Sequence, residues 1–324
     1  MHRCRWTVCI CICICMSLSL VCATPALAQP DLSRTIGSTV ADRASASYVF
    51  SALRLTAADG QRRYRVRIAV PKTPPPTAGY PVVYLLDGNA ALMELDAHLL
   101  DSLSTHGDAP VLVFIADDSA LRIDAIGRSL DYTPARYGDG RVETDPLNPQ
   151  RRTGGAAAFA QLIATRIRPQ VEARVAVDTG RQTVWGHSYG GLFVLHVLLT
   201  QPQLFQHYVA VDPSLWWGDG FIVDQAHRVV DAAKSTDAHT PQVSRSVTVM
   251  AGEGEPATRN PAARATPTER PGRPRADPHA APKLVALLSS LPGIKADYRP
   301  LPGLTHGQTL GASLAPTLRD AAAR

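Results

Sequence analysis

A serine flanked by glycines occurs in the middle of the chain, in the sequence Gly186-His187-Ser188-Tyr189-Gly190. A G-x-S-x-G pattern permits the sharp strand-to-helix turn on which a nucleophilic serine can stand, because the glycines remove side chains that would collide there. The N-terminus of the following helix would direct backbone N–H groups at the charge that forms during attack on a carbonyl. An apolar β-type run precedes the pattern and a helical run follows it. We therefore predict that Ser188 is a nucleophile; the alternative is a turn whose small residues permit close packing.

The serine hydroxyl needs a base to take its proton. In folds with this turn, the base comes from a loop after the last strand. His306 stands in such a loop, in "PLPGLTHGQTL", and we predict that it is the general base. An ordinary loop histidine is the alternative. We expect the ring of His187, inside the turn, to point away from the serine.

The third catalytic group and the oxyanion hole are less clearly marked. Glu253 or Glu255 is the predicted acid, because both follow the strand-like run "VTVMAG"; each could equally be a solvated loop carboxylate. The oxyanion hole needs two backbone donors. We expect the N–H groups of Tyr189 and of Asn89, which lies in "YLLDGN", to supply them. Asp87 is interpreted as a turn residue beside a glycine.

Apolar runs of strand length alternate with runs of helical periodicity along the chain. This order predicts an α/β fold with a mainly parallel central sheet flanked by helices, of the α/β-hydrolase type and in a single domain over residues 48–324. Pro169 is expected to kink or break its helix. The predicted strands are residues 64–70, 82–88, 110–116, 181–186, 208–211, 246–250 and 294–301, and the predicted helices are residues 90–103, 154–175 and 192–199.

The first 28 residues have the pattern of a secretory signal peptide. Arg3 and Arg5 precede an apolar stretch of about fifteen residues, which is too short for a comfortable membrane span, and an A-x-A site predicts cleavage after Ala28. All six cysteines of the chain fall in this leader, so we expect the mature protein to have no disulfide and no cysteine metal site. Residues 29–47 are expected to form a flexible segment. The protein is therefore predicted to be periplasmic or secreted.

Charge and composition argue against several partners. Removal of Arg3 and Arg5 lowers the net charge from +5 to +3, which gives no case for a nucleic-acid partner. After the leader, no apolar run reaches membrane-spanning length. Residues 256–282 hold seven prolines and five arginines, and we interpret them as a solvated insertion loop; a basic patch for an anionic partner is the alternative. No metal or other cofactor is expected, and the sequence does not indicate an oligomeric state.

Several long segments together resemble the periplasmic siderophore esterases, the enterobactin-esterase-like members of the esterase D group of α/β-hydrolases. The resemblance extends over about residues 48–320. Its segments, in chain order, are "GYPVVYLLDGNAALMELD", "RSLDYTPARY", "RRTGGAAAFAQLIATRIRPQVE", "VWGHSYGGLFVLHVLL", "DPSLWW" and "LPGLTHG".

The resemblance implies that Ser188 attacks an ester carbonyl, that His306 relays the proton, and that catecholate siderophore lactones are the substrate class. It also implies that Arg128, just before "DYTP", lies near a bound ferric catecholate; a surface arginine is the alternative. Iron would then enter only with the substrate. Trp216 and Trp217 stand where the family commonly has smaller residues, so they could shape the acyl pocket, stack on an aromatic substrate or belong to the core.

Two other interpretations remain open at the level of sequence. A feruloyl or acetyl esterase of carbohydrates, or an acyltransferase, would use the same mechanism on another substrate. A protein without catalytic activity that binds a ferric siderophore would belong to a different functional class.

Overall fold

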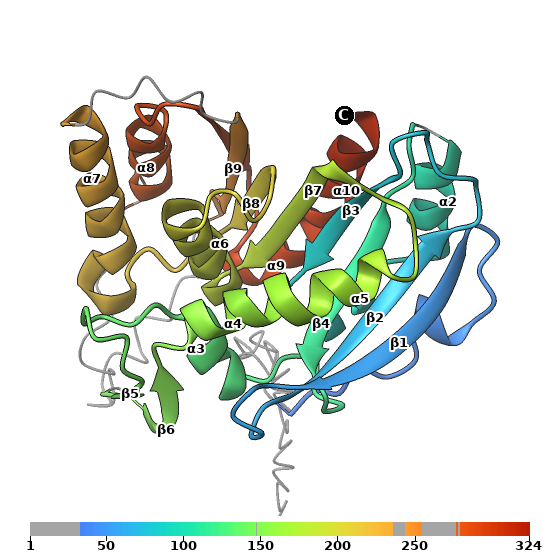
Figure 1. Cartoon of the computed structure of the whole chain (residues 1–324), viewed down its shortest axis with the longest axis horizontal. Helices are drawn as coiled ribbons and strands as arrows, with labels where there is room; N and C mark the ends of the chain where they lie inside the picture. Colours follow the sequence, from blue (N-terminus) through green and yellow to red (C-terminus); the bar gives the residue numbers. More distant parts are fainter. Residues whose placement is uncertain (1–32, 106, 147, 236–243, 255–276, 278) are drawn as a thin grey trace, which may run out of the picture.

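The computed structural model describes residues 33–105, 107–146, 148–235, 244–254, 277 and 279–324. The predicted signal peptide lies outside the described residues. The described ranges form a central eight-stranded sheet with helices on both faces (Figure 1). Its strands are β1 (Tyr48–Thr56), β2 (Arg63–Pro71), β3 (Tyr80–Leu85), β4 (Val111–Asp117), β7 (Val177–His187), β8 (His207–Val211), β9 (Arg245–Gly252) and β10 (Ile294–Leu301).

The strand order is β1-β2-β4-β3-β7-β8-β9-β10. All neighbours from β4 to β10 are parallel, whereas β1 pairs with β2 and β2 pairs with β4 in antiparallel fashion. The predicted mainly parallel sheet is confirmed, with an antiparallel edge that the sequence analysis did not foresee. Because parallel strands end at the same edge of a sheet, residues that follow β3, β7, β8 and β10 can meet there.

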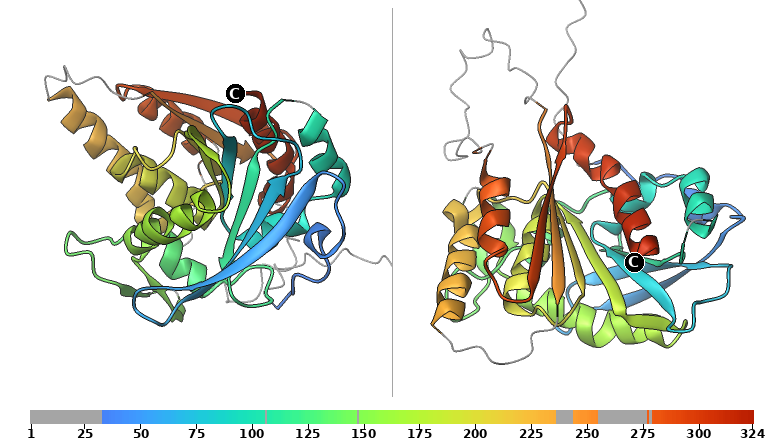
Figure 2. Two further views of the ribbon diagram at one scale, coloured as in Figure 1. Left: turned by 45° about the vertical axis from the view of Figure 1, so that its right-hand side comes forward. Right: turned by 90° about the horizontal axis from the view of Figure 1, so that it is seen from above.

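Both faces of the central strands are buried, as their continuous apolar runs predict. In β3, Val82 and Tyr84 belong to one hydrophobic cluster, and Val83 and Leu85 belong to the other. The right-hand view of Figure 2 shows the sheet on edge between two layers of helices. The first cluster takes residues from α3 (Gly127–Tyr132), α4 (Ala156–Leu162), α5 (Arg168–Glu172), α6 (Tyr189–Thr200), α7 (Phe221–Lys234) and α8 (Ala280–Leu288), and the second from α1 (Gly88–Met93), α2 (Ala97–Thr105), α9 (His306–Ala312) and α10 (Leu314–Ala323).

Two predicted helices differ from the structure in their continuity. The run 90–103 contains α1 and α2 with a break between them, where the Asp96 carboxylate accepts the Leu99 N–H at 2.7 Å at the start of α2. The run 154–175 continues from α4 through a π-helical turn, Ile163–Ile167, into α5. Pro169 lies in the first turn of α5, directly after the π-helical turn, so the helix continues past Pro169 and the expected break does not occur.

The segments before and within the domain also differ from expectation. The described part of the predicted flexible segment lies against the domain, because Ile36 N–H donates to Ala120 O at 2.8 Å and Arg122 N–H donates to Arg34 O at 2.7 Å. Most of the predicted insertion 256–282 lies outside the described residues, and its last residues belong to α8. A two-stranded hairpin, β5 (Glu143–Asp145) and β6 (Asn148–Thr153), extends beside the sheet (Figure 1). No described helix has the length and apolar character that a membrane span requires.

Candidate active site

Ser188 occupies a tight turn between β7 and α6. Its φ of 61° and ψ of −115° are unusual for a residue with a side chain, and such strain is typical of functional turns. A Cβ on Gly186 would lie 2.4 Å from the carbonyl carbon of Gly190, so the turn requires a glycine at position 186. The Ser188 N–H donates to Val211 O in the neighbouring strand β8 at 2.9 Å. The sequence therefore folds locally into the expected turn.

The structure brings Ser188 and His306 together although they are 118 positions apart. Ser188 Oγ and His306 Nε2 are separated by 3.2 Å, a distance that suits proton transfer from hydroxyl to imidazole. His306 begins α9, where Thr305 caps the helix and pairs with Gln308 in a capping box. Half of the His306 side chain is exposed, which leaves a path for substrate. Ser214 Oγ also lies 3.3 Å from Ser188 Oγ.

Asp212 is the acidic residue beside His306, and the sequence analysis missed it. Its Oδ2 lies 3.7 Å from His306 Nδ1, which is an ion-pair contact when the ring is protonated and is too long for a good hydrogen bond. Asp212 directly follows β8, the strand next to β7, and has a φ of +40°. The signal that could have revealed it is an acidic residue at the end of the predicted strand 208–211.

The Asp212 carboxylate is held ionised by its surroundings. Its Oδ2 accepts the Thr309 hydroxyl at 2.7 Å, and its Oδ1 accepts the Gly252 N–H at 3.2 Å. Burial alone would raise the pKa of this carboxyl, but the interactions with His306, Thr309 and Gly252 lower the pKa below its ordinary value. An ionised carboxylate at this place can orient the imidazole and stabilise the imidazolium.

The two predicted acids are placed differently. The Glu253 N–H donates to Leu301 O at 3.1 Å, and burial together with the adjacent Glu253 carboxylate raises the pKa of the Tyr298 phenol. Glu253 therefore interacts with Tyr298 in β10, while Asp212 takes the place beside His306. Glu255 lies outside the described residues.

His187 contacts the backbone of His306, the predicted base. Its Nε2–H donates to the His306 carbonyl oxygen at 2.8 Å and lies 3.2 Å from Thr309 Oγ1. The ring centroids of His187 and His306 are 4.7 Å apart. Burial, with a smaller contribution from His306, lowers the pKa of His187 to about 3, so the ring is neutral near neutral pH. His187 can thus fix the backbone of His306 without adding a positive charge.

Within the described part of the chain, one group of three side chains could ligate a metal ion, and it consists of His187, Asp212 and His306. The candidate ligand atoms of His187, Asp212 and His306 lie within 4.8 Å of one another. However, His187 Nε2 contacts the His306 carbonyl, Asp212 accepts two hydrogen bonds, and His306 Nε2 contacts Ser188. The arrangement fits a proton-transfer network better than a cation site.

The two predicted oxyanion donors lie at the starts of helices that follow two adjacent strands of the sheet, β3 and β7. Tyr189 is the first residue of α6, and Asn89 is the second residue of α1. Backbone N–H groups in a first helical turn lack intrahelical acceptors. The Asn89 side chain is used elsewhere, because its Oδ1 accepts from Arg67 at 2.7 Å and its Nδ2 donates to Leu121 O at 2.8 Å. This side chain therefore anchors the loop.

A pocket of about 280 Å³ opens between the β5–β6 hairpin and the turn before α7. Its lining includes Tyr189, directly after the serine, and the two tryptophans for which a pocket role was considered, Trp216 and Trp217. Trp217 is almost fully buried, whereas Trp216 is partly exposed and its ring centroid lies 6.1 Å from that of Tyr189. The lining also contains polar side chains: the positively charged Arg136, the negatively charged Asp145 and Asp219, and the neutral Thr153.

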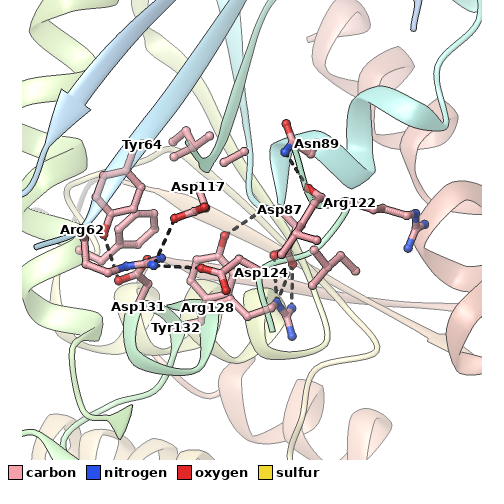
Figure 3. Close-up of a pocket in the computed structure, with 15 residues that line it drawn as sticks. Arg62, Tyr64, Asp87, Asn89, Asp117, Arg122, Asp124, Arg128, Asp131 and Tyr132 are labelled. Carbon is pink, nitrogen blue, oxygen red and sulfur yellow. Dashed lines mark hydrogen bonds and ion pairs between the residues drawn. The ribbon is translucent and has the colours of Figure 1, made fainter. Parts of the chain in front are cut away.

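The Arg128 side chain is largely buried beside the turn that carries Ser188. Its Nε and Nη2 donate to the Asp87 carboxylate at 2.9 and 2.7 Å, and Nη2 also donates to His187 O at 3.1 Å. Figure 3 shows this pair at one side of a small polar cavity. Asp87, interpreted from sequence as a turn residue, therefore also carries a buried ion pair.

The strand order, the strained serine turn and the histidine after the last strand define the α/β-hydrolase fold. Within that class, the sequence model of the Esterase family, described as "Putative esterase", matches residues 58–272. The chain belongs to this family.

Known relatives share both sequence and architecture with the chain. It is 42% identical over 199 residues to the apo-salmochelin esterase of Escherichia coli O6:H1 (strain CFT073), covering 61% of each protein. It is 35% identical over 184 residues to the ferri-bacillibactin esterase BesA of Bacillus subtilis (strain 168), covering 54% of this chain and 62% of that protein. These matches span less than two thirds of the relatives' lengths. The solved structure of the enterobactin and salmochelin hydrolase IroE aligns with a TM-score of 0.68 and 31% identity, over 88% of this chain and 99% of that one. The resemblance to siderophore esterases is confirmed.

Proposed function

We propose that the protein is a serine esterase that hydrolyses ester bonds of catecholate siderophores, with enterobactin-like lactones as the substrate class. The observation that carries this proposal is the 3.2 Å separation of Ser188 Oγ and His306 Nε2 beside an aromatic pocket. Relatives named as siderophore esterases support the substrate class. The leader over residues 1–28 supports action in the periplasm or outside the cell.

In the proposed reaction, Ser188 Oγ bonds to the ester carbonyl carbon while its proton passes to His306 Nε2. The negative charge on the carbonyl oxygen faces the N–H groups of Tyr189 and Asn89. The C–O bond to the leaving alcohol then breaks, and His306 returns the proton to that alcohol. Water, deprotonated by His306, releases the acyl group by the same steps, while Asp212 stabilises the imidazolium.

The pocket beside Ser188 suits a hydroxylated aromatic acyl group. Trp216, Trp217 and Tyr189 provide apolar ring surface, and ring pairs of this kind favour tilted or offset contacts. Arg136 and Asp219 can hydrogen-bond ring hydroxyls at the rim. A feruloyl group is also a hydroxylated aromatic ring. A direct comparison of a catecholate siderophore ester with a feruloyl ester therefore decides between the two substrate classes.

The test is chromatography of digests of an iron-free catecholate trilactone, its ferric complex and a feruloylated oligosaccharide. The wild-type protein is expected to open the trilactone to linear fragments, and Ser188→Ala to be slower by at least about 10³-fold. Cleavage of the sugar ester alone would refute the siderophore assignment. Unchanged turnover by Ser188→Ala would refute the nucleophile, and tight binding of the ferric complex without cleavage of any ester would indicate a binding protein.

A further inference from the structure

A second serine, Ser214, lies beside the predicted nucleophile. Its Oγ is 3.3 Å from Ser188 Oγ, and its N–H donates to the Ser188 carbonyl oxygen at 3.1 Å. Ser214 is 2% exposed, so it reaches Ser188 from inside the protein, whereas half of the His306 side chain is exposed. Within the described ranges, Ser188 Oγ therefore has a hydroxyl on its buried side and an imidazole on its open side.

The burial of Ser214 determines which of the two hydroxyls donates. A hydroxyl carries one proton, and a buried donor without an acceptor costs free energy. Among the groups that the structure describes, Ser188 Oγ is the one hydrogen-bond partner of Ser214 Oγ. The Ser214 proton is therefore satisfied by donation to Ser188 Oγ, and the Ser188 proton then points at His306 Nε2. The reverse arrangement would leave the Ser214 proton without an acceptor and turn the Ser188 proton away from the base.

The turn that carries Ser214 is held closely against α6. It follows β8, which lies next to β7 (Figure 1). The Trp217 N–H donates to the Ser214 carbonyl oxygen at 3.0 Å. A Cβ on Gly191 of α6 would lie 3.0 Å from Pro213 Cα, so the turn packs directly on the helix that begins after Ser188. These contacts hold Ser214 in place through its backbone and its neighbours, and its hydroxyl is left for Ser188.

The same turn contacts both members of the predicted catalytic pair. Asp212 Oδ2 faces His306 Nδ1 across 3.7 Å, and two positions later Ser214 Oγ contacts Ser188 Oγ. One side chain thus acts on the base and the other on the nucleophile. Because the two contacts involve different atoms, substitutions can separate them.

We infer that Ser214 is a catalytic residue whose hydroxyl donates a hydrogen bond to the oxygen of the nucleophile. In the resting protein this bond directs the Ser188 proton to His306. The distance of 3.3 Å is long for an O–H···O bond, and it should shorten as negative charge develops on Ser188 Oγ. The inference rests on Ser188 being the nucleophile of the proposed function, but not on the identity of the ester.

The bond acts in both halves of the reaction. In the first half, Ser188 Oγ bonds to the carbonyl carbon as its proton passes to His306 Nε2. In the second half, the C–Oγ bond breaks, its electron pair stays on Oγ, and His306 returns a proton to that atom. The Ser214 proton stays on Ser214 throughout and stabilises the partial negative charge on Oγ in each transition state, where hydrogen bonds to charged groups are strongest.

Ser214→Ala tests the inference, because it removes the hydroxyl and keeps the backbone bond to Ser188. Single-turnover and steady-state kinetics with a p-nitrophenyl ester measure the two halves of the reaction, per active site titrated with an organophosphonate. We expect both rate constants to fall by about 10- to 50-fold, with the dissociation constant of the ester unchanged within about twofold. Ser214→Cys, whose thiol is a weak donor, should be at least about fivefold slower and serves if the alanine variant fails to fold.

A matched control and a double variant exclude a merely structural role. Ser246→Ala removes a hydroxyl that lies 2.7 Å from His207 Nδ1, where β8 and β9 begin, and both rate constants should stay within about twofold of wild type. Ser214→Ala should slow an Asp212→Asn protein by the same factor as it slows wild type, because His306 remains in both and the two side chains act on different atoms.

A double variant no slower than Asp212→Asn alone would overturn the inference, since Ser214 would then act only by holding the turn that carries Asp212. Rates in Ser214→Ala equal to or above those of wild type would overturn it as well. Failure of the proposed function would look different, because Ser188→Ala would then retain turnover of the same ester.

Discussion

At the scale of single residues, the site holds His306 at two separate points. Its carbonyl oxygen accepts the His187 Nε2–H at 2.8 Å, and its ring faces Asp212 across 3.7 Å. Thr309 links the two supports, because its hydroxyl contacts the Asp212 carboxylate and lies within reach of His187. Backbone and ring of the predicted base are therefore fixed by different neighbours, which should keep Nε2 directed at Ser188.

Asp212→Asn tests the place of Asp212 in this network. We expect kcat for a p-nitrophenyl ester to fall by about 10- to 100-fold, less than the ~10⁴-fold loss known where acid and imidazole are directly hydrogen-bonded. The smaller loss follows from the 3.7 Å separation. Stopped-flow or steady-state assays at pH 7 measure it.

Glu253→Gln is the control for this prediction, since Glu253 follows β9 and lies beside Tyr298. It should change kcat by less than about twofold. The assignment of Asp212 would be contradicted by a large loss in Glu253→Gln together with a small one in Asp212→Asn.

At the scale of elements, three strand ends carry residues of the candidate site, and each is followed by a residue with a positive φ that is not glycine. These residues are Asp87 after β3, Ser188 after β7 and Asp212 after β8. A positive φ is rare for a residue with a side chain, so the three turns at this edge of the sheet depend on the packing around them. The two glycines around Ser188 differ in this context. A Cβ on Gly186 would strike the Gly190 backbone, whereas a Cβ on Gly190 would meet Leu86 at an ordinary 3.6 Å.

Gly186→Ala and Gly190→Ala should therefore behave differently. Gly186→Ala must displace the start of α6, and we expect esterase activity to fall by more than about 100-fold. Gly190→Ala should remain active, with an equal or higher melting temperature, because alanine favours a helix over glycine. Activity assays and thermal unfolding of both variants provide the measurement, and equal losses in the two would contradict the packing described for the turn.

The sequence predicted much of this scaffold and some of the site. Continuous apolar runs such as 82–88 and 110–116 indicate buried strands directly, and the spacing around Ser188 together with a late histidine predicts a pair that the fold brings together. Asp212 was missed because the acid was sought after a later strand. The pairing of Arg128 with Asp87 joins residues 41 positions apart and depends on where the short helix α3 packs, which no local pattern encodes.

At the scale of the whole molecule, several titratable groups are buried near the sheet. Burial lowers the pKa of His187 to about 3, and burial raises the pKa of Asp131 to about 6 despite its contacts with Arg62. Below pH 6.5 the unfolded chain binds a proton at His187 that the folded chain does not, so acidification destabilises the fold. Asp131 acts in the opposite sense, because the folded state binds its proton first as the pH falls through 6.

The free energy of unfolding should therefore depend on pH through His187. For this residue alone the free energy should fall by up to about 1.4 kcal/mol per pH unit as the pH falls from 6 to 4. Urea unfolding of wild type and His187→Gln at several pH values measures the difference. The variant should show the shallower dependence on pH, and identical slopes would contradict a buried neutral His187.

The central claim is that Ser188 is a nucleophile activated by His306. It is tested most directly by mass spectrometry of the protein after reaction with an organophosphonate, with peptide mapping of the modified residue. We predict one adduct per chain, at Ser188, and labelling slowed by at least about 10²-fold in His306→Ala. An adduct on another residue, or labelling at the wild-type rate without His306, would contradict the account.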